Sequence, residues 1–266
     1  MKQFSLLLLG LLLFSCSSKS DNKIVLTSDF GPPAKLTEHI QKDFKTWWTY
    51  HKKYSLLSRD FTPLDESGRV IEKTAYLKQL ATGKYISIRL YDPDSTIFYK
   101  LYTMNPQAAL YIQDNVKDDA AAEYARMSWE GDPFPDFEFT DLNGVTYRKE
   151  DLKGKTVFFK TWFIGCKPCI AEMPDLNAMV AHYKDREDVL FISVALDKAG
   201  PLEKFLSKTQ FDYAVVADQK KFLRSNEFFQ TFNAFPTHVV MDKQGKVAKV
   251  TSSYEELEYA VERMEL

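Results

Sequence analysis

Two nearly continuous apolar runs, TVFFKTWF at 156–163 and VLFISVAL at 189–196, constrain the fold of this chain most strongly. Strands with one face in water alternate apolar and polar residues, whereas strands buried on both faces do not. Between and after these runs, helices are predicted at 167–182, near 201–208 and around 219–232. Buried strands that alternate with helices predict an α/β region in which helices cover both faces of a central sheet.

The same region contains further strand and turn signals. Strands are predicted at YAVVAD, THVVMD and KVAKVT, followed by a final helix from Tyr254. A hairpin, FEFTDLNGVTYRKEDLKGK, precedes the first buried strand, and its Asn143-Gly144 supplies the positive-φ turn.

A boundary is expected at WEGDPFPDF, since its two prolines, Pro133 and Pro135, force extended backbone. The α/β region then occupies residues 129–266, and residues 24–128 form a separate N-terminal unit of unknown role.

The N-terminal unit has the pattern of a small α+β domain. A helix is predicted from Leu36 to Leu57, then Tyr- and Ile-rich strands at KYISIRLY and STIFYKLY. A second helix follows Asn105-Pro106, where proline suits a first helical position.

The first residues indicate export. Residues 1–15 contain Lys2 and an apolar run from Leu6 to Phe14, about half of the ~20 residues that a membrane-spanning helix needs. The motif Leu13-Phe14-Ser15-Cys16 resembles a bacterial lipobox, in which the cysteine becomes the lipidated first residue. Residues 16–23 would then be the lipidated Cys16 and a polar tether. The alternative is an ordinary cleaved signal peptide.

Cys16 apart, the chain contains only Cys166 and Cys169. Cysteines three residues apart close a loop too short to constrain an unfolded chain, so chemistry must explain them. Half of a zinc site is the alternative, but it needs two more ligands, and the histidines are scattered singly. No metal and no cofactor are expected.

Cys166 is predicted at a helix N-terminus, where unpaired N–H groups favour a thiolate and lower the thiol pKa. Cys169, one turn later, can displace a partner that is bonded to Cys166. Lys167 adds positive charge, and Pro168 restricts the first helical turn. No histidine lies between the cysteines, which favours a reductant over an oxidant.

The segment CKPCIAEMPDL matches the CxPCxxExPxL pattern, and the chain here resembles TlpA/ResA-type thioredoxin-like proteins, which are membrane-tethered thiol-disulfide oxidoreductases. The resemblance extends over about 132–266, roughly half the chain, and includes the hairpin. It implies a thioredoxin-like fold, a central mixed sheet with helices on both faces.

Several residues acquire roles from this resemblance. Pro174 matches the proline that kinks the active-site helix. Trp162 matches a family aromatic residue, and Glu172 matches the glutamate of the motif. Pro236 resembles the cis-proline of the fold, whose loop, Phe235, Pro236 and Thr237 here, binds the substrate backbone.

Three positions depart from the family pattern. Gly165 replaces a tryptophan before the first cysteine, which strips an apolar cover from the dithiol. Lys160 stands where classical thioredoxins have a buried carboxylate, and it either handles the proton of Cys169 or extends its ammonium to the sheet edge. Thr140 replaces a hairpin glutamate of some relatives.

Other classes fit less well. Peroxiredoxins need a hydroxyl three residues before the reactive cysteine, where this chain has Phe163. Copper chaperones of related fold use a wider cysteine spacing, although His238 is available. The 35 Lys+Arg against 37 Asp+Glu include no basic tract, which argues against nucleic-acid binding.

The sequence thus predicts a lipid-anchored thiol-disulfide oxidoreductase on the periplasmic side of a bacterial cell envelope. It would reduce disulfide-bearing proteins and receive electrons from a membrane thiol donor. The alternatives are a disulfide oxidase or isomerase, and a partner-binding, redox-switched scaffold with little catalysis.

Overall fold

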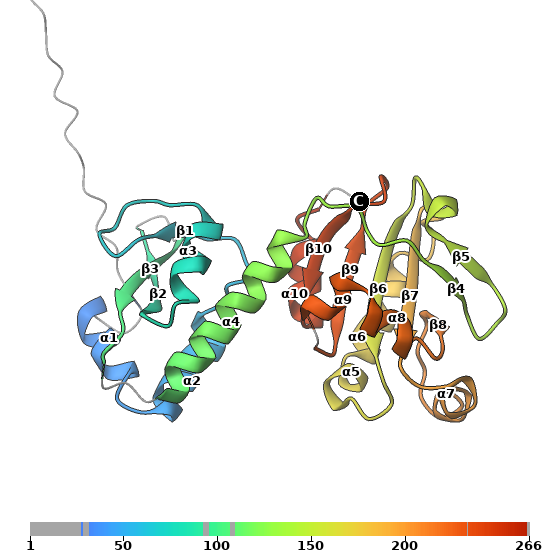
Figure 1. Ribbon diagram of the computed structural model, residues 1–266, viewed down its shortest axis with the longest axis horizontal. Helices are drawn as coiled ribbons and strands as arrows, with labels where there is room; N and C mark the ends of the chain where they lie inside the picture. The colour runs from blue at the N-terminus through green and yellow to red at the C-terminus, as the bar shows by residue number, and fades with distance from the viewer. Residues whose placement is uncertain (1–27, 29–31, 93–95, 107–109, 233, 265–266) are drawn as a thin grey trace, which may run out of the picture.

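The computed structural model describes residues 28, 32–92, 96–106, 110–232 and 234–264. The predicted signal peptide, Cys16 and its tether lie outside these residues. Figure 1 shows a smaller N-terminal region and a larger C-terminal region joined by one long helix, α4 (Leu110–Ser128). No helix among the described residues is both long and apolar enough to cross a membrane.

The N-terminal region is an α+β unit around a three-stranded sheet in the order β1-β3-β2. Strand β3 pairs parallel to β1 and antiparallel to β2. The predicted strands and the helix after Asn105-Pro106 are therefore confirmed. The elements before α4 are α1 (Pro33–Ile40), α2 (Phe44–Tyr54), β1 (Thr62–Leu64), α3 (Lys73–Leu80), β2 (Tyr85–Tyr91) and β3 (Ile97–Thr103).

The single helix predicted from Leu36 to Leu57 is wrong, because two helices, α1 and α2, occupy this stretch. Asp43 adopts extended backbone, and its carboxylate accepts hydrogen bonds from the backbone N–H and the hydroxyl of Thr46, both at 2.8 Å. An aspartate that caps the first turn in this way begins a new helix.

The C-terminal region contains a five-stranded mixed sheet in the order β10-β9-β6-β7-β8. The strands β6, β7 and β8 are parallel, and β9 and β10 are antiparallel to their neighbours. This is the predicted thioredoxin-like arrangement. The strands are β6 (Thr156–Trp162), β7 (Val189–Ala195), β8 (Ala214–Val216), β9 (Thr237–Met241) and β10 (Val247–Thr251).

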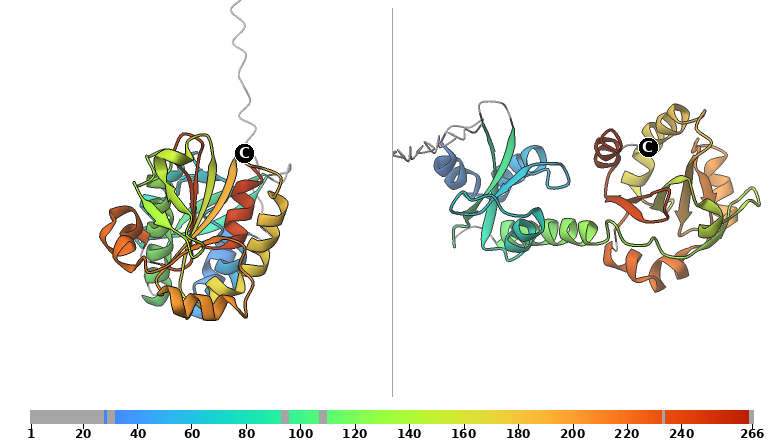
Figure 2. Two further views of the ribbon diagram at one scale, coloured as in Figure 1. Left: turned by 90° about the vertical axis from the view of Figure 1, so that its right-hand side faces the viewer. Right: turned by 90° about the horizontal axis from the view of Figure 1, so that it is seen from above.

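Helices cover both faces of this sheet. In the right-hand view of Figure 2, α6 and α10 lie on one side, and α8 and α9 lie on the other. The predicted hairpin forms a separate two-stranded sheet, with Gly144 at φ +82° in its turn. The remaining elements are β4 (Glu138–Thr140), β5 (Thr146–Arg148), the 3₁₀ helix η1 (Lys149–Leu152), α5 (Lys167–Ala171), α6 (Met173–His182), α7 (Ala199–Leu206), α8 (Lys220–Ser225), α9 (Glu227–Phe232) and α10 (Tyr254–Val261).

All seven residues of β6 are buried. Its alternate residues therefore pack against different helices. Phe159 belongs to the cluster that contains Phe228 of α9, whereas Phe158 packs with Leu176 of α6. Lys160 lies two residues after Phe158, so its side chain points to the same face of the sheet. This is the face that α5 and α6 cover.

Two helices predicted as continuous are interrupted. The helix at 167–182 divides at Glu172, where Pro174 in the first turn of α6 lacks the N–H that would continue α5. The helix at 219–232 divides at Asn226, which is extended and accepts a hydrogen bond from Phe228 N–H at 3.1 Å. The kink assigned to Pro174 by resemblance is therefore confirmed.

The two regions are in contact, and α4 packs against β10 and α9. The chain after α4 continues the sheet, since Gly131 N–H donates to Val247 O and Val247 N–H donates to Asp132 O, both at 2.8 Å. An ion pair of 2.7 Å joins Lys249 of β10 to Glu130. The edge of the large sheet at β10 is thereby covered.

Candidate active site

Cys166 and Cys169 form a disulfide at the end of β6, with their Cα atoms 5.3 Å apart. Cys166 is the N-cap residue of α5, and its Sγ accepts a hydrogen bond from Cys169 N–H at 3.3 Å. Cys166 is 4% exposed and Cys169 is 0% exposed. Of the two sulfur-bearing residues, Cys166 is thus the one with access to solvent.

A short turn carries the chain from β6 to the disulfide. Cys166 N–H donates to Phe163 O at 3.0 Å, and Ile164 N–H donates to the Asp197 carboxylate at 2.8 Å. Asp197 lies two residues after the end of β7, and the carboxyl ends of adjacent parallel strands meet at one edge of the sheet. That placement could have identified Asp197, which the sequence analysis missed.

The surroundings of the disulfide are open on one side and apolar on the other. Gly165, Lys167 and Pro168 are exposed, as expected where glycine replaces a bulky residue. Phe163 and Phe235 meet edge to face beside the pair, with ring centroids 5.4 Å apart. The dithiol is therefore flanked by aromatic rings but has no side chain above it at position 165.

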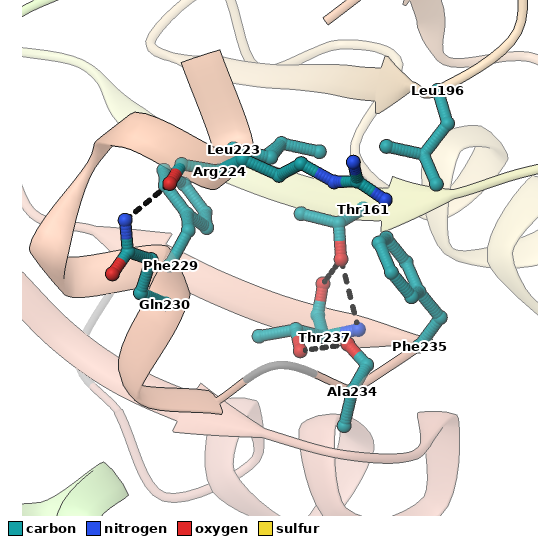
Figure 3. A pocket seen from close by; sticks show the side chains of 9 residues that line it. All are labelled: Thr161, Leu196, Leu223, Arg224, Phe229, Gln230, Ala234, Phe235 and Thr237. Carbon is teal, nitrogen blue, oxygen red and sulfur yellow. Dashed lines mark hydrogen bonds between the residues drawn. The ribbon is translucent and has the colours of Figure 1, made fainter. Parts of the chain in front are cut away.

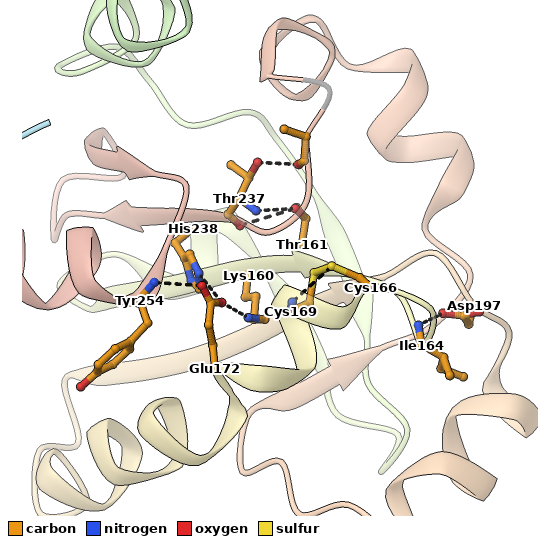
Figure 4. The surroundings of a disulfide bond; sticks show 11 residues. Lys160, Thr161, Ile164, Cys166, Cys169, Glu172, Asp197, Thr237, His238 and Tyr254 are labelled. Atoms are coloured by element: carbon orange, nitrogen blue, oxygen red, sulfur yellow. Dashed lines mark hydrogen bonds and ion pairs between the residues drawn. A yellow bond between two sulfur atoms is a disulfide. The ribbon is translucent and has the colours of Figure 1, made fainter. Parts of the chain in front are cut away.

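The peptide bond between Phe235 and Pro236 is cis, which confirms the expectation from the resemblance. Thr237 ties this loop to β6, because its N–H donates to Thr161 Oγ1 at 3.2 Å. Thr237 Oγ1 in turn donates to Ala234 O at 2.8 Å. Figures 3 and 4 show both threonines between the loop and the strand that leads to the disulfide.

A buried charge cluster lies beneath α5 (Figure 4). Lys160 is 0% exposed, and its Nζ lies 2.7 Å from Glu172 Oε2. The same carboxylate oxygen lies 3.1 Å from His238 Nε2, and Glu172 Oε1 accepts a hydrogen bond from Tyr254 N–H at 3.0 Å. Lys160 therefore stays inside the protein and does not extend to the sheet edge.

Burial sets the ionisation of this cluster. It lowers the pKa of both Lys160 and His238, because their charged forms lose hydration that Glu172 only partly replaces. Burial alone would raise the pKa of Glu172, but the hydrogen bonds and charges of His238 and Lys160 outweigh it and lower that pKa. An ionised carboxylate only accepts hydrogen bonds, so His238 Nε2 carries the proton.

The place of His238 in this cluster is not predicted by the sequence, in which the histidines are scattered singly. His238 is 1% exposed, and its Nδ1 has no hydrogen-bond partner in the described part of the chain. The antiparallel register pairs His238 on β9 directly with Lys160 on β6. Only the register of the two strands, which the sequence pattern does not fix, places the histidine beside the lysine.

The other predicted residues take ordinary structural positions. Trp162 is buried against Phe205 and Phe211, with ring centroids 5.9 and 5.6 Å away. Thr140 is exposed on the hairpin and hydrogen-bonds Thr146. Among the residues that the structure describes, no group of three or more His, Cys, Asp or Glu side chains could hold a metal ion.

The fold and the CxxC disulfide define a thioredoxin-like protein of the TlpA/ResA type, a class of thiol-disulfide oxidoreductases. Residues 129–265 match the Redoxin family model, and the chain belongs to this family.

Several relatives each match about half of the chain. The thiol-disulfide oxidoreductase ResA of Geobacillus kaustophilus is 33% identical over 138 residues, which cover 50% of this chain and 76% of that protein. The thioredoxin-like protein YneN of Bacillus subtilis is 28% identical over 125 residues, covering 46% of this chain and 70% of YneN.

A solved thiol:disulfide interchange protein from a Bacteroides species is 25% identical over 51% of this chain and 89% of its own, with a TM-score of 0.45.

Proposed function

We propose that this thiol-disulfide oxidoreductase reduces disulfides in other proteins through Cys166 and Cys169. Two neighbouring features support the proposal. Cys166 is the N-cap residue of α5, and Thr237 holds the loop at Pro236 against β6, the strand that leads to Cys166. An edge of backbone beside a reactive sulfur allows an extended substrate segment to bind next to it.

The exchange proceeds in two displacements. The Cys166 thiolate attacks one sulfur of the substrate disulfide, forming a mixed disulfide and releasing the other substrate sulfur as a thiolate that takes a proton. The Cys169 thiolate then attacks Cys166 Sγ, forming the enzyme disulfide and releasing the second substrate thiol. Two electrons pass to the substrate, and a thiol donor must return two to the enzyme.

We propose that Lys160 handles the proton of Cys169 and stabilises the negative charge of its thiolate during the second displacement. Cys169 and Glu172 are three residues apart on one helical face, and Lys160 enters this face from β6 to reach Glu172. A protonated lysine beneath the helix stabilises the Cys169 thiolate by Coulomb attraction, which is strong where water is excluded. His238 and Tyr254 N–H hold the Glu172 carboxylate in position.

The direct test is reduction of insulin by dithiothreitol in the presence of the purified chain without residues 1–16. We expect catalysis that disappears in a Cys166→Ser/Cys169→Ser double variant. A double variant as active as the wild type would refute the proposal.

The reducing direction is tested by the potential of the pair against glutathione. Thioredoxin lies near about −270 mV, protein disulfide isomerase near about −180 mV and strong oxidants near about −120 mV. We expect a value closest to that of thioredoxin. A value at or above that of the isomerase would favour the oxidase or isomerase alternative.

The cellular location belongs to the same proposal. We propose that lipidated Cys16 holds the protein to a membrane on the periplasmic side of the envelope, where a membrane thiol donor reduces it. Fatty-acid labelling should depend on Cys16, and Cys16→Ala should move the protein to the soluble fraction. Labelling that persists in Cys16→Ala would exclude this anchor.

A binding role for the N-terminal region has one observation in its favour. Phe44 and Trp48 of α2 are stacked with centroids 5.9 Å apart and are exposed, and Tyr111 lies edge-on to Phe44. Trp47, beside them, is buried. Exposed, clustered aromatic residues are typical of contact surfaces.

A further inference from the structure

A cavity of about 340 Å³ lies beside the loop at Pro236, on the side of β6 that faces α8 and α9. Figure 3 shows the side chains that surround it. Its walls combine apolar side chains, among them Leu196, Phe229 and Phe235, with polar ones. Thr161 and Thr237, which tie the loop to β6, also line it, so the cavity borders the place where the proposed substrate segment binds.

The polar groups of the cavity are almost all used internally. Thr161 Oγ1 accepts from Thr237 N–H, and Thr237 Oγ1 donates to Ala234 O. The amide nitrogen of Gln230 donates to the backbone oxygen of Arg224. The two threonines therefore have little capacity left for a neutral polar ligand.

Arg224, from α8, is the exception. Figure 3 shows its guanidinium extending across the cavity toward Thr161 and Leu196. Of the ion pairs found within the described residues, none includes Arg224. A planar guanidinium presents a fork of donors that matches a carboxylate, and it cannot lose its charge near neutral pH.

We propose that this cavity selects disulfide substrates that carry an acidic side chain, glutamate above all, next to the cysteine that Cys166 attacks. The methylene groups of glutamate would pack on Leu196 and Phe235, while its carboxylate would pair with Arg224. This inference rests on the proposed function, since it names the substrate class of the same site. Charge-assisted pairs of this kind are stronger than neutral hydrogen bonds.

The experiment compares three disulfide peptides that are identical except for the residue beside the cysteine, which is Glu, Gln or Lys. We expect the wild-type chain to reduce the Glu peptide with kcat/KM about tenfold above the Gln peptide, and the Lys peptide more slowly than either. Because Arg224 is exposed, the preference should shrink at high salt.

Variants test whether Arg224 causes the preference for the Glu peptide. Arg224→Gln should make the Glu and Gln peptides equivalent, and Arg224→Glu should reverse the order in favour of the Lys peptide. Lys221→Gln, an exposed cation on the same helix that does not line the cavity, should keep the preference. Equal rates for the Glu and Gln peptides in the wild type, or a preference that persists in Arg224→Gln, would overturn the inference.

The experiment distinguishes failure of the acidic preference from failure of the proposed reductase function. Efficient reduction of all three peptides at one rate would remove the acidic preference and leave the reductase function standing. No reduction of any peptide, together with no reduction of insulin, would overturn the proposed function and the inference with it.

Discussion

The two regions of the molecule differ in how completely their buried polar groups are hydrogen-bonded. In the N-terminal region, the buried tyrosine hydroxyls are hydrogen-bonded. Tyr76 Oη lies 2.7 Å from Ser87 Oγ, and Tyr99 Oη accepts from Leu56 N–H at 3.0 Å. Burial raises the pKa of Tyr99 to about 12, so its hydroxyl stays protonated.

In the C-terminal region, by contrast, buried polar atoms are left without partners near the disulfide. Trp162 Nε1 and His238 Nδ1 have no hydrogen-bond partner among the described residues, and the fully buried Lys160 is paired only with Glu172 among the described ion pairs. Each such group costs free energy in a stable fold. The C-terminal region thus leaves polar groups unpaired around its chemistry, whereas the buried tyrosine hydroxyls of the N-terminal region have partners.

Loss of Cys166 should have the largest effect. Cys166→Ser removes the attacking sulfur, so insulin reduction should fall to the rate without enzyme, whereas Tyr76→Phe in the N-terminal region should leave the rate unchanged. Both rates come from the same turbidity assay. A Cys166→Ser variant with wild-type activity would erase the proposed difference between the regions.

Lys160→Met should affect both stability and the second exchange step. Removing one partner of a buried ion pair costs about 3 kcal/mol in the free energy of unfolding, since the Glu172 carboxylate loses its lysine partner. Loss of the positive charge should also raise the pKa of Cys169 by about one unit. Stopped-flow measurement of mixed-disulfide resolution should then give a roughly tenfold slower rate at pH 7.

The double variant Lys160→Met/Glu172→Gln separates these effects. It contains no unpaired buried charge, so it should recover much of the lost stability. Resolution of the mixed disulfide should stay slow, because the positive charge is still missing. A rate that returns to the wild-type value with stability would assign Lys160 a structural role alone.

Tyr76→Phe should cost about 1 kcal/mol in chemical unfolding, because Ser87 Oγ loses its buried partner. The double variant Tyr76→Phe/Ser87→Ala should be closer to the wild type, since it leaves no polar atom unpaired. A change of the reduction rate in either variant would mean that the N-terminal region contributes to the chemistry.

His238→Gln should act on the pH dependence of stability. Burial holds the pKa of His238 below 6.5, so the unfolded chain binds a proton that the folded chain does not. Wild-type stability should therefore fall as the pH decreases below 6.5, by up to about 1.4 kcal/mol per unit. Glu172, whose pKa is lowered, affects the pH dependence of stability only below about pH 4.5. Between pH 6.5 and 5, the change in stability therefore reports on the histidine.

Unfolding measured from pH 7 to 5 should show a smaller slope for His238→Gln than for the wild type. Lys160, Glu172 and Glu256 provide the charges around this ring, and they remain in the variant. His182→Gln, on the exposed face of α6, is the control for loss of a histidine. Identical slopes in the wild type and His238→Gln would contradict the account.

Much of the C-terminal fold could be predicted because its signals are local. The runs TVFFKTWF and VLFISVAL are β6 and β7, and Gly144 forms the predicted turn. Helix interruptions were harder, since Asp43 and Asn226 act through hydrogen bonds to residues two or three positions later, within stretches of otherwise helical pattern.

The candidate site was predictable only in part. The spacing of Cys166 and Cys169 predicts that they are the reactive pair. The cis bond before Pro236 was expected from the resemblance alone. The partners of Lys160 could not be read along the chain, because Glu172 and His238 reach it from a helix and from a neighbouring strand. Contacts between distant segments depend on strand register, which sequence pattern fixes weakly for strands buried on both faces.

The most direct test of the account is to trap the mixed disulfide from each side. Cys169→Ser and Cys166→Ser proteins are each reduced, mixed with a disulfide peptide and analysed by intact mass. The account predicts a stable peptide adduct on Cys166 in Cys169→Ser and little or none in Cys166→Ser. An adduct that forms mainly on Cys169, or equally on both, would contradict the assignment of Cys166 as the attacking sulfur.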